Sequence, residues 1–239
     1  MPSFEVLLVL GAFGFYLYDS CMLLYANELI FIRANDRWDF VSPGNNYLLL
    51  GKSPYFPNPL TPHKMVFRVY WSDSGQHKPN NMESLERFMS SLIELQYIVI
   101  ILLALFFLLL PLVLLFYGSG SQLLWVFALI YINIGVMLTQ VYRRKEILMI
   151  STRKFILLLL ESFLCAPFAL NILRKLSLHR TLYGDPIKFA QNSFDKTTFY
   201  NLIDVVCRKI DEQLELIEIY SPRHSSLQSY RVRIKEMEQ

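Results

Sequence analysis

The chain has 239 residues, of which 54% are hydrophobic and 18% charged, and its formal net charge is +3. So small a charge excludes the strongly basic surface that binds nucleic acid, and we expect no nucleic-acid partner. The 3 cysteines and 4 histidines have neither an even disulfide count nor the spacing of zinc ligands. This excludes a disulfide framework and predicts neither a metal site nor a cofactor.

Four stretches of the sequence are apolar over lengths that soluble core helices seldom reach. They are Val6–Ile32, Tyr97–Tyr117, Leu123–Tyr142 and Phe155–Leu173. A bilayer core about 30 Å thick is crossed by roughly 20 apolar residues in a helix that rises about 1.5 Å per residue. The pattern predicts a polytopic α-helical membrane protein with three to four membrane segments and a small α+β cytoplasmic appendage.

The first apolar stretch begins almost at Met1, where a cleavable signal peptide would also begin. Residues 1–5 contain Glu5 but no basic residue, and no small-residue cleavage site follows. We therefore expect residues 1–33 to remain in the protein as the first membrane span.

Residues 34–81 are predicted as a cytoplasmic, β-rich loop. The runs Trp38–Val41, Tyr47–Leu50 and Met65–Trp71 are rich in aromatic and β-branched residues, and segments that contain proline or glycine separate them. This pattern indicates three strands in a short antiparallel meander.

Apolar residues recur at helical spacing from Leu85 to Ile93, directly before the second apolar stretch. Asn80 and Glu83 have the spacing of a capping box at the start of this helix. Residues 82–117 are therefore predicted as one long helix that runs into the second span. Such a helix is about 54 Å long, so its first turns would protrude and offer an apolar stripe to a partner or to the rest of the chain.

Residues 123–142 are predicted as the third span and residues 143–154 as a basic cytoplasmic loop. Lys and Arg collect on cytoplasmic flanks, and here they follow the first and third spans. This predicts an N-terminus outside an inner (plasma) membrane of bacterial type. The residues expected to set this topology or to bind lipid head groups are Arg143, Arg144, Lys145, Arg153, Lys154, Arg174 and Lys175.

The fourth segment, residues 155–173, departs from the pattern. It carries Glu161 near its middle and Pro167, which breaks a helical hydrogen bond, and basic residues follow it. One interpretation is a segment that enters the membrane and returns, or lies in the interface. The alternative is an ordinary fourth span with an external tail.

Residues 174–239 are predicted as a soluble tail. Asp195 can cap an amphipathic helix, Lys196–Tyr220, which has one apolar and one acidic face. Apolar and basic residues alternate from Tyr230 to Lys235, which predicts a terminal strand.

Polar side chains within the apolar stretches are the first candidates for function, because such groups are costly at membrane depth. The candidates are Asp19, Asn133, Glu161 and Asn171. Asp19, Asn133 and Glu161 could together form a proton or cation site. In the alternative, each lies near an interface or makes a hydrogen bond between helices.

The sequence contains no recognisable catalytic, nucleotide-binding or metal-binding motif, which favours a protein that is not an enzyme. We therefore expect an integral membrane protein that acts in assembly, as a scaffold or by binding a partner. Its partners would be the lipid bilayer and a protein or a second copy of the chain. The alternatives are a small transporter or channel subunit that uses intramembrane carboxylates and, third, a membrane-interface enzyme.

Overall fold

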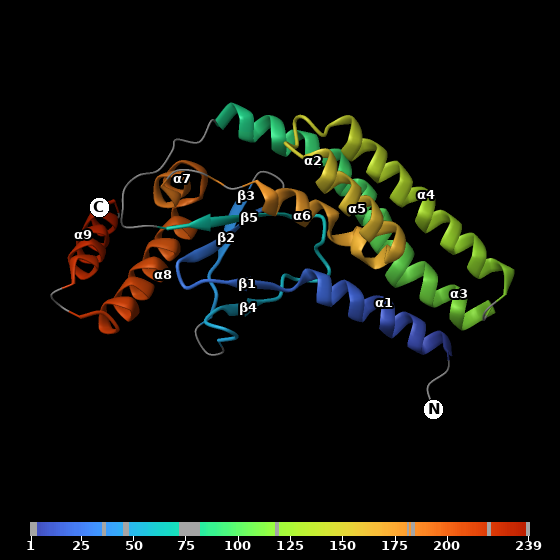
Figure 1. Cartoon of the computed structure of the whole chain (residues 1–239), viewed down its shortest axis with the longest axis horizontal. Helices are drawn as coiled ribbons and strands as arrows, with labels where there is room; N and C mark the ends of the chain where they lie inside the picture. Colours follow the sequence, from blue (N-terminus) through green and yellow to red (C-terminus); the bar gives the residue numbers. More distant parts are fainter. Residues whose placement is uncertain are drawn as a thin grey trace. The chain divides into compact units, whose positions relative to one another are not determined.

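A computed structural model describes residues 4–34, 37–44, 48–71, 82–117, 120–180, 182, 185–218 and 221–237 (Figure 1). The chain is mainly helical with a small sheet region, as the sequence predicts, and it divides into two compact units. The helical unit comprises Met1–Met22, Phe56–Lys64 and Asn81–Ser177, and the sheet unit comprises Leu23–Tyr55, Met65–Asn80 and Leu178–Gln239.

The longest helix of the helical unit runs without a break from Met82 to Tyr117. It consists of α2 (Met82–Ala104), a π-helical turn η1 (Leu105–Leu109) and α3 (Leu110–Tyr117). The amide of Leu110 bonds to the carbonyl of Leu105, directly before Pro111, which has no amide hydrogen to donate. The predicted capping residue Asn80 lies outside the described residues.

Helix α4 (Ser121–Arg143) packs against α2 and α3 (Figure 1). The contact is made by apolar side chains three or four residues apart, such as Ile130, Ile134 and Met137 on α4. Both the Met82–Tyr117 helix and α4 are long and apolar enough to cross a membrane.

The prediction of a first span over residues 1–33 is wrong. Helix α1 (Phe4–Ser20) has 17 residues, and the chain then continues into the strands β1 (Met22–Leu24) and β2 (Glu28–Ala34). Strand β2 is the centre of a sheet and is buried through Phe31, so its apolar run resembles a membrane segment in the sequence. Periodicity alone does not separate a fully buried strand from a buried helix.

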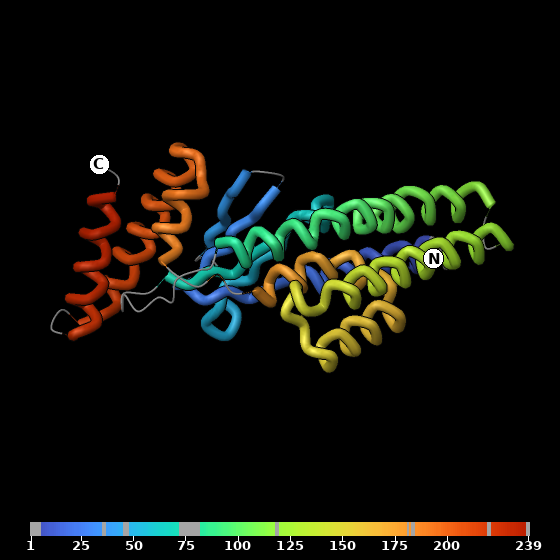
Figure 2. The backbone as a smooth tube through the Cα atoms, turned by 90° about the horizontal axis from the view of Figure 1, so that it is seen from above, coloured from blue at the N-terminus to red at the C-terminus, as the bar shows by residue number. Residues whose placement is uncertain are grey.

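The segment predicted as the fourth membrane segment, residues 155–173, is not one continuous helix. Helix α5 (Thr152–Leu164) has 13 residues and ends at Cys165. A 3₁₀ helix η2 (Ala166–Asn171), with Pro167 in its first turn, then leads into α6 (Ile172–His179). The chain reverses direction at this break, so that α5 and α6 form a hairpin (Figure 1 and Figure 2).

The main sheet of the sheet unit has three antiparallel strands in the order β3-β2-β5. β2 pairs with β3 (Arg37–Val41) and with β5 (Met65–Tyr70), so that Phe31 lies opposite Phe40 and Phe67. A separate pair joins β1 to β4 (Ser53–Tyr55).

The predicted meander is therefore wrong in its middle strand. Two of its three strands correspond to β3 and β5, but β2 lies between them instead of the predicted Tyr47–Leu50. Tyr47 lies outside the described residues, and Leu49 makes an isolated bridge with Lys52. The centre of a covered sheet favours the more continuously apolar run, which is β2.

Three helices complete the sheet unit: α7 (Pro186–Ser193), α8 (Lys196–Glu215) and α9 (Pro222–Glu236). Asp195 caps α8 by accepting a hydrogen bond from the amide of Thr198, as its position in the sequence suggests. Helix α8 packs against α7, α9 and β3.

The predicted terminal strand, Tyr230–Lys235, is wrong because these residues belong to α9. Leu227, Tyr230 and Ile234 are buried, and their spacing is that of one helical face. The alternation of apolar and basic residues is coincidental here, since Val232 is half exposed. Pro222 in the first turn and the cap from Ser221 begin the helix.

Candidate functional site

The helical unit contains a charged cluster where α1 ends. We define the cluster as Asp19, Glu161, Asn171, Arg174 and Lys175, which come from α1, α5, η2 and α6. The ammonium of Lys175 lies 2.8 Å from a carboxylate oxygen of Asp19 and 2.8 Å from one of Glu161. The structure thus brings together two predicted candidates, Asp19 and Glu161, through a lysine assigned in the sequence to head groups or topology.

Asn171 holds the buried side of the cluster and is only 1% exposed. Its amide nitrogen donates to Asp19 at 3.1 Å and to the carbonyl of Tyr16 at 3.2 Å. Its carbonyl oxygen accepts from Arg174 at 3.3 Å and from the hydroxyl of Ser20 at 3.1 Å. Both ends of the amide are therefore hydrogen-bonded inside the protein, as burial requires.

Arg174 is 3% exposed and extends the cluster to the segment 56–64. Its guanidinium donates to the carbonyls of Asn58 at 2.6 Å and Thr61 at 3.0 Å. The hydroxyl of Tyr16 donates to the carbonyl of Pro59 at 2.6 Å. The cluster thereby fastens the segment 56–64 to α1 and α6, and the hydrogen bonds of Arg174 lie inside the protein.

The cluster contains two carboxylates and two cations, and Lys175 forms ion pairs with both carboxylates. The side chain of Asp19 is 13% exposed and that of Glu161 is 44% exposed, so solvent screens the second ion pair more than the first. A site that binds a transported cation needs carboxylate oxygens that the protein itself leaves without a counter-charge. Here Lys175 already supplies that counter-charge, so the arrangement works chemically as a fastening between helices.

The other residues predicted from the sequence lie outside the charged cluster. Asn133 is on α4 and, among the described residues, is not one of the groups in contact with Lys175. Arg144 pairs with Glu94 and donates to the carbonyl of Ser91 at 2.7 Å. Lys145 lies 5.1 Å over the ring of Tyr142, while Arg143, Arg153 and Lys154 are exposed.

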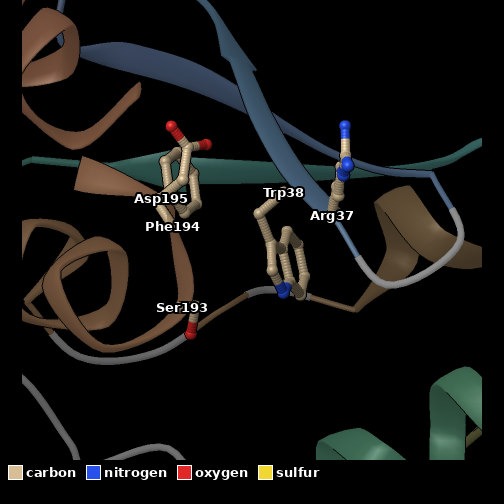
Figure 3. A pocket seen from close by; sticks show the side chains of 5 residues that line it. All are labelled: Arg37, Trp38, Ser193, Phe194 and Asp195. Atoms are coloured by element: carbon tan, nitrogen blue, oxygen red, sulfur yellow. The ribbon is translucent and has the colours of Figure 1, made fainter. Parts of the chain in front are cut away.

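The sheet unit has a cavity of about 510 Å³ beside the start of α8 (Figure 3). It is lined by Arg37, Trp38, Ser193, Phe194 and Asp195. The rings of Trp38 and Phe194 are stacked with centroids 6.4 Å apart, and Trp38 also contacts Phe67 and Phe189. The cavity therefore has an aromatic wall.

Asp195 and Arg37 add a carboxylate and a guanidinium to the lining of the cavity. In Figure 3 the side chains of Arg37 and Asp195 point the same way, on opposite sides of Trp38. The amide of Thr198 donates to Asp195 and lowers the pKa of that carboxyl, so it remains a carboxylate. An ionised carboxylate and an arginine on opposite sides of the aromatic wall suit recognition of a charged or hydrogen-bonding group more than proton transfer.

Lys209 on α8 is a buried cation that sequence reasoning missed. It is 5% exposed, and its ammonium donates to the carbonyls of Pro43 at 3.0 Å and Ala26 at 3.5 Å. Burial lowers the pKa of this lysine below its ordinary value. Its position between Val206 and Ile210, on the buried stripe of the helix, was the available signal.

The described part of the chain contains no group of three or more His, Cys, Asp or Glu side chains that could hold a metal ion. Comparisons with protein-family models, curated proteins and solved structures found no match to this chain.

Proposed function

We propose that this chain is an integral membrane protein that works by binding a partner protein rather than by catalysis or transport. Membrane insertion is supported by the outer faces of its two long helices. Large apolar side chains are exposed there, including Leu115 on α3 and Leu124 and Trp125 on α4. In water this surface would be a large unfavourable patch, whereas lipid tails are an equally apolar neighbour.

The proposed topology has α1, the Met82–Tyr117 helix and α4 as membrane segments, with the N-terminus outside. Helix α1 is about 26 Å long, near the thickness of a bilayer core. The α5–α6 hairpin then enters the membrane and returns, since a 13-residue helix is too short to cross. This topology leaves the sheet unit on the cytoplasmic side of an inner (plasma) membrane.

The observation that carries the choice of binding over transport is the charged cluster. Lys175 lies 2.8 Å from both carboxylates, and Arg174, which is hydrogen-bonded to Asn171, is the second cation of the cluster. A cluster satisfied in this way stabilises one arrangement of helices and leaves no vacant coordination site for an ion.

The sheet-unit cavity is the proposed docking place for the partner. Trp and Arg are enriched among residues that carry binding energy in protein interfaces, and Trp38 and Arg37 line this cavity. The partner is expected to insert a side chain against the aromatic wall. It would also present a negatively charged or hydrogen-bonding group to Arg37.

Copurification of the full chain in mild detergent tests this function. We expect a stoichiometric partner protein or a defined homo-oligomer, and we expect Arg37→Glu to release it. Arg208→Glu is the matched control, because Arg208 is an exposed arginine of α8 that does not line the cavity. A strictly monomeric particle that carries no partner would contradict the proposal.

The convergence of Asp19 and Glu161 is the one observation that favours transport, and a flux assay separates the two functions. Under the binding proposal, Glu161→Gln in reconstituted vesicles leaves proton and cation flux at the level of protein-free vesicles, as does the unmodified chain. A flux through the unmodified chain that Glu161→Gln abolishes would establish transport instead.

A further inference from the structure

A tight turn in the sheet unit exposes three consecutive leucines. We call Leu48, Leu49 and Leu50 the leucine tip; their exposed fractions are 65%, 57% and 90%. The amide of Leu49 donates to the carbonyl of Lys52 at 2.7 Å, and the amide of Lys52 donates back at 3.0 Å. These two bonds close a two-residue hairpin turn that holds Leu50 at its outermost point.

The backbone at this turn is unusual for leucine. Leu50 has φ of 53° and Gly51 has φ of 75°, so both central residues are in the left-handed region. Turns of this type select Asn, Asp or Gly at the first position, because a larger side chain is strained there. The chain instead places a leucine there and exposes it almost completely, which stabilises neither the turn nor the core.

The surroundings of the leucine tip match a lipid surface. From residue 40 to residue 72 the sequence contains no Asp or Glu, and Lys52 follows the tip by two residues. The ammonium of Lys52 lies 4.3 Å over the ring of Tyr25, which is half exposed. Exposed leucines, a half-exposed tyrosine and a lysine over its ring form a combination that partitions into the head-group region of a bilayer.

Chain length keeps the tip near the membrane. Tyr25 follows the end of α1 at Ser20 by five residues, which span at most about 17 Å. Lys52 contacts the Tyr25 ring, so the turn is tethered to the same short connection. If α1 is a membrane segment, this connection leaves the bilayer at the interface.

We propose that the leucine tip inserts into the interfacial layer of the bilayer on the side where α1 ends, and so anchors the sheet unit to the membrane surface. The inference rests on the proposed function, because it requires that the helical unit lies in the same bilayer. The occupant of the tip is lipid, with Lys52 facing the anionic head groups.

Single-cysteine fluorescence in lipid nanodiscs tests this inference. The full chain, with Cys21, Cys165 and Cys207 replaced by serine and its fold checked by circular dichroism, receives a polarity-sensitive fluorophore at one position at a time. The positions are Leu50→Cys at the tip, Gln228→Cys on exposed α9 as the matched control, and Leu115→Cys on α3 as the membrane reference. Lipids that carry a quencher near the head group are then added.

The expected result is a blue-shifted Leu50 probe that loses at least about half of its emission to head-group quencher, while the Gln228 probe does not respond. A Leu50 probe as water-exposed as Gln228, with Leu115 in lipid, overturns the tip inference and leaves the proposed function standing. A Leu50 probe that is shifted but not quenched also overturns it and indicates a protein contact. Water exposure at Leu115 contradicts membrane insertion itself, and the inference fails with it.

Discussion

The two units of the chain distribute charge and apolar surface in opposite ways. In the helical unit Arg174 and Asn171 are buried and hydrogen-bonded to each other, whereas Leu115 and Trp125 are exposed. The sheet unit buries Phe31 and its aromatic neighbours in a core, while its α8 exposes Asp204 and Arg208. The first pattern is the one expected of a protein surface in lipid, and the second is the one expected of a surface in water.

The sheet unit also contains two exceptions to its own pattern. Lys209 is a cation inside the sheet unit, and the leucine tip is an apolar group on its surface. Backbone carbonyls stabilise the first, and the proposed insertion into the bilayer interface would account for the second. The contrast between the units can be tested at the buried charges and at the helix ends.

Loss of the buried arginine should have the largest effect. Arg174→Ala removes two hydrogen bonds to the carbonyls of Asn58 and Thr61 and leaves the charged cluster with excess negative charge. Each hydrogen bond lost from a charged donor, or acceptor left unsatisfied, costs about 1–3 kcal/mol, so we expect a fall of several kcal/mol in the free energy of unfolding, measured by thermal or denaturant unfolding in detergent.

Arg143→Ala is the matched control, because Arg143 is exposed at the end of α4. Its effect should stay within about 0.5 kcal/mol, as for most surface substitutions. Equal effects of the two substitutions would show that the charged cluster does not stabilise the helical unit.

We expect the burial of Lys209 to make the free energy of unfolding depend on pH, with an effect of intermediate size. Because burial lowers the pKa of Lys209 in the folded state, the unfolded chain binds more protons between that pKa and the ordinary value of 10.5. Stability should therefore rise with pH through this window, relative to a variant that lacks the group. Loss of the bond to Pro43 should also cost Lys209→Met about 1–3 kcal/mol.

Chemical unfolding of the unmodified chain and of Lys209→Met, from neutral pH to pH 10.5, measures this difference. Subtracting the two curves cancels the titration of groups that both proteins share. A difference that stays flat or decreases with pH would mean that Lys209 is not desolvated in the folded protein.

The cap of α9 should give the smallest effect. The Ser221 hydroxyl accepts a hydrogen bond from the amide of Arg223, so Ser221→Ala should cost about 1 kcal/mol of unfolding free energy. Ser229→Ala, at an exposed position within the helix, should change stability by only a few tenths of a kcal/mol. Equal effects would speak against a helix that begins at Pro222.

The sequence predicted the parts of the fold that depend on local pattern. The apolar length of residues 82–117 and the position of Asp195 before an amphipathic stretch are local signals, and α2, α3 and α8 lie where these signals place them. The central strand β2 was missed because burial on both faces removes the alternation that marks a strand. In α9, apolar and basic residues alternate over a short stretch, so the helical spacing of Leu227, Tyr230 and Ile234 was not recognised.

The candidate site was predicted in its members but not in its contacts. Asp19, Glu161 and Asn171 stand out as polar groups in apolar stretches. Asp19 and Glu161 both meet Lys175, and Asn171 meets Asp19; these contacts depend on the turn at Cys165, which brings α6 back along α5. Residues far apart in the chain meet there through tertiary packing, and a single sequence carries no local signal for such a contact.

The central claim is that lipid surrounds the helical unit. Alkaline carbonate extraction of membranes that contain the full chain tests it most directly, because this treatment releases peripheral proteins and leaves integral ones in the bilayer. The account predicts that the chain stays in the membrane pellet until detergent is added. Recovery of the intact chain as a monodisperse monomer in the detergent-free supernatant would contradict it.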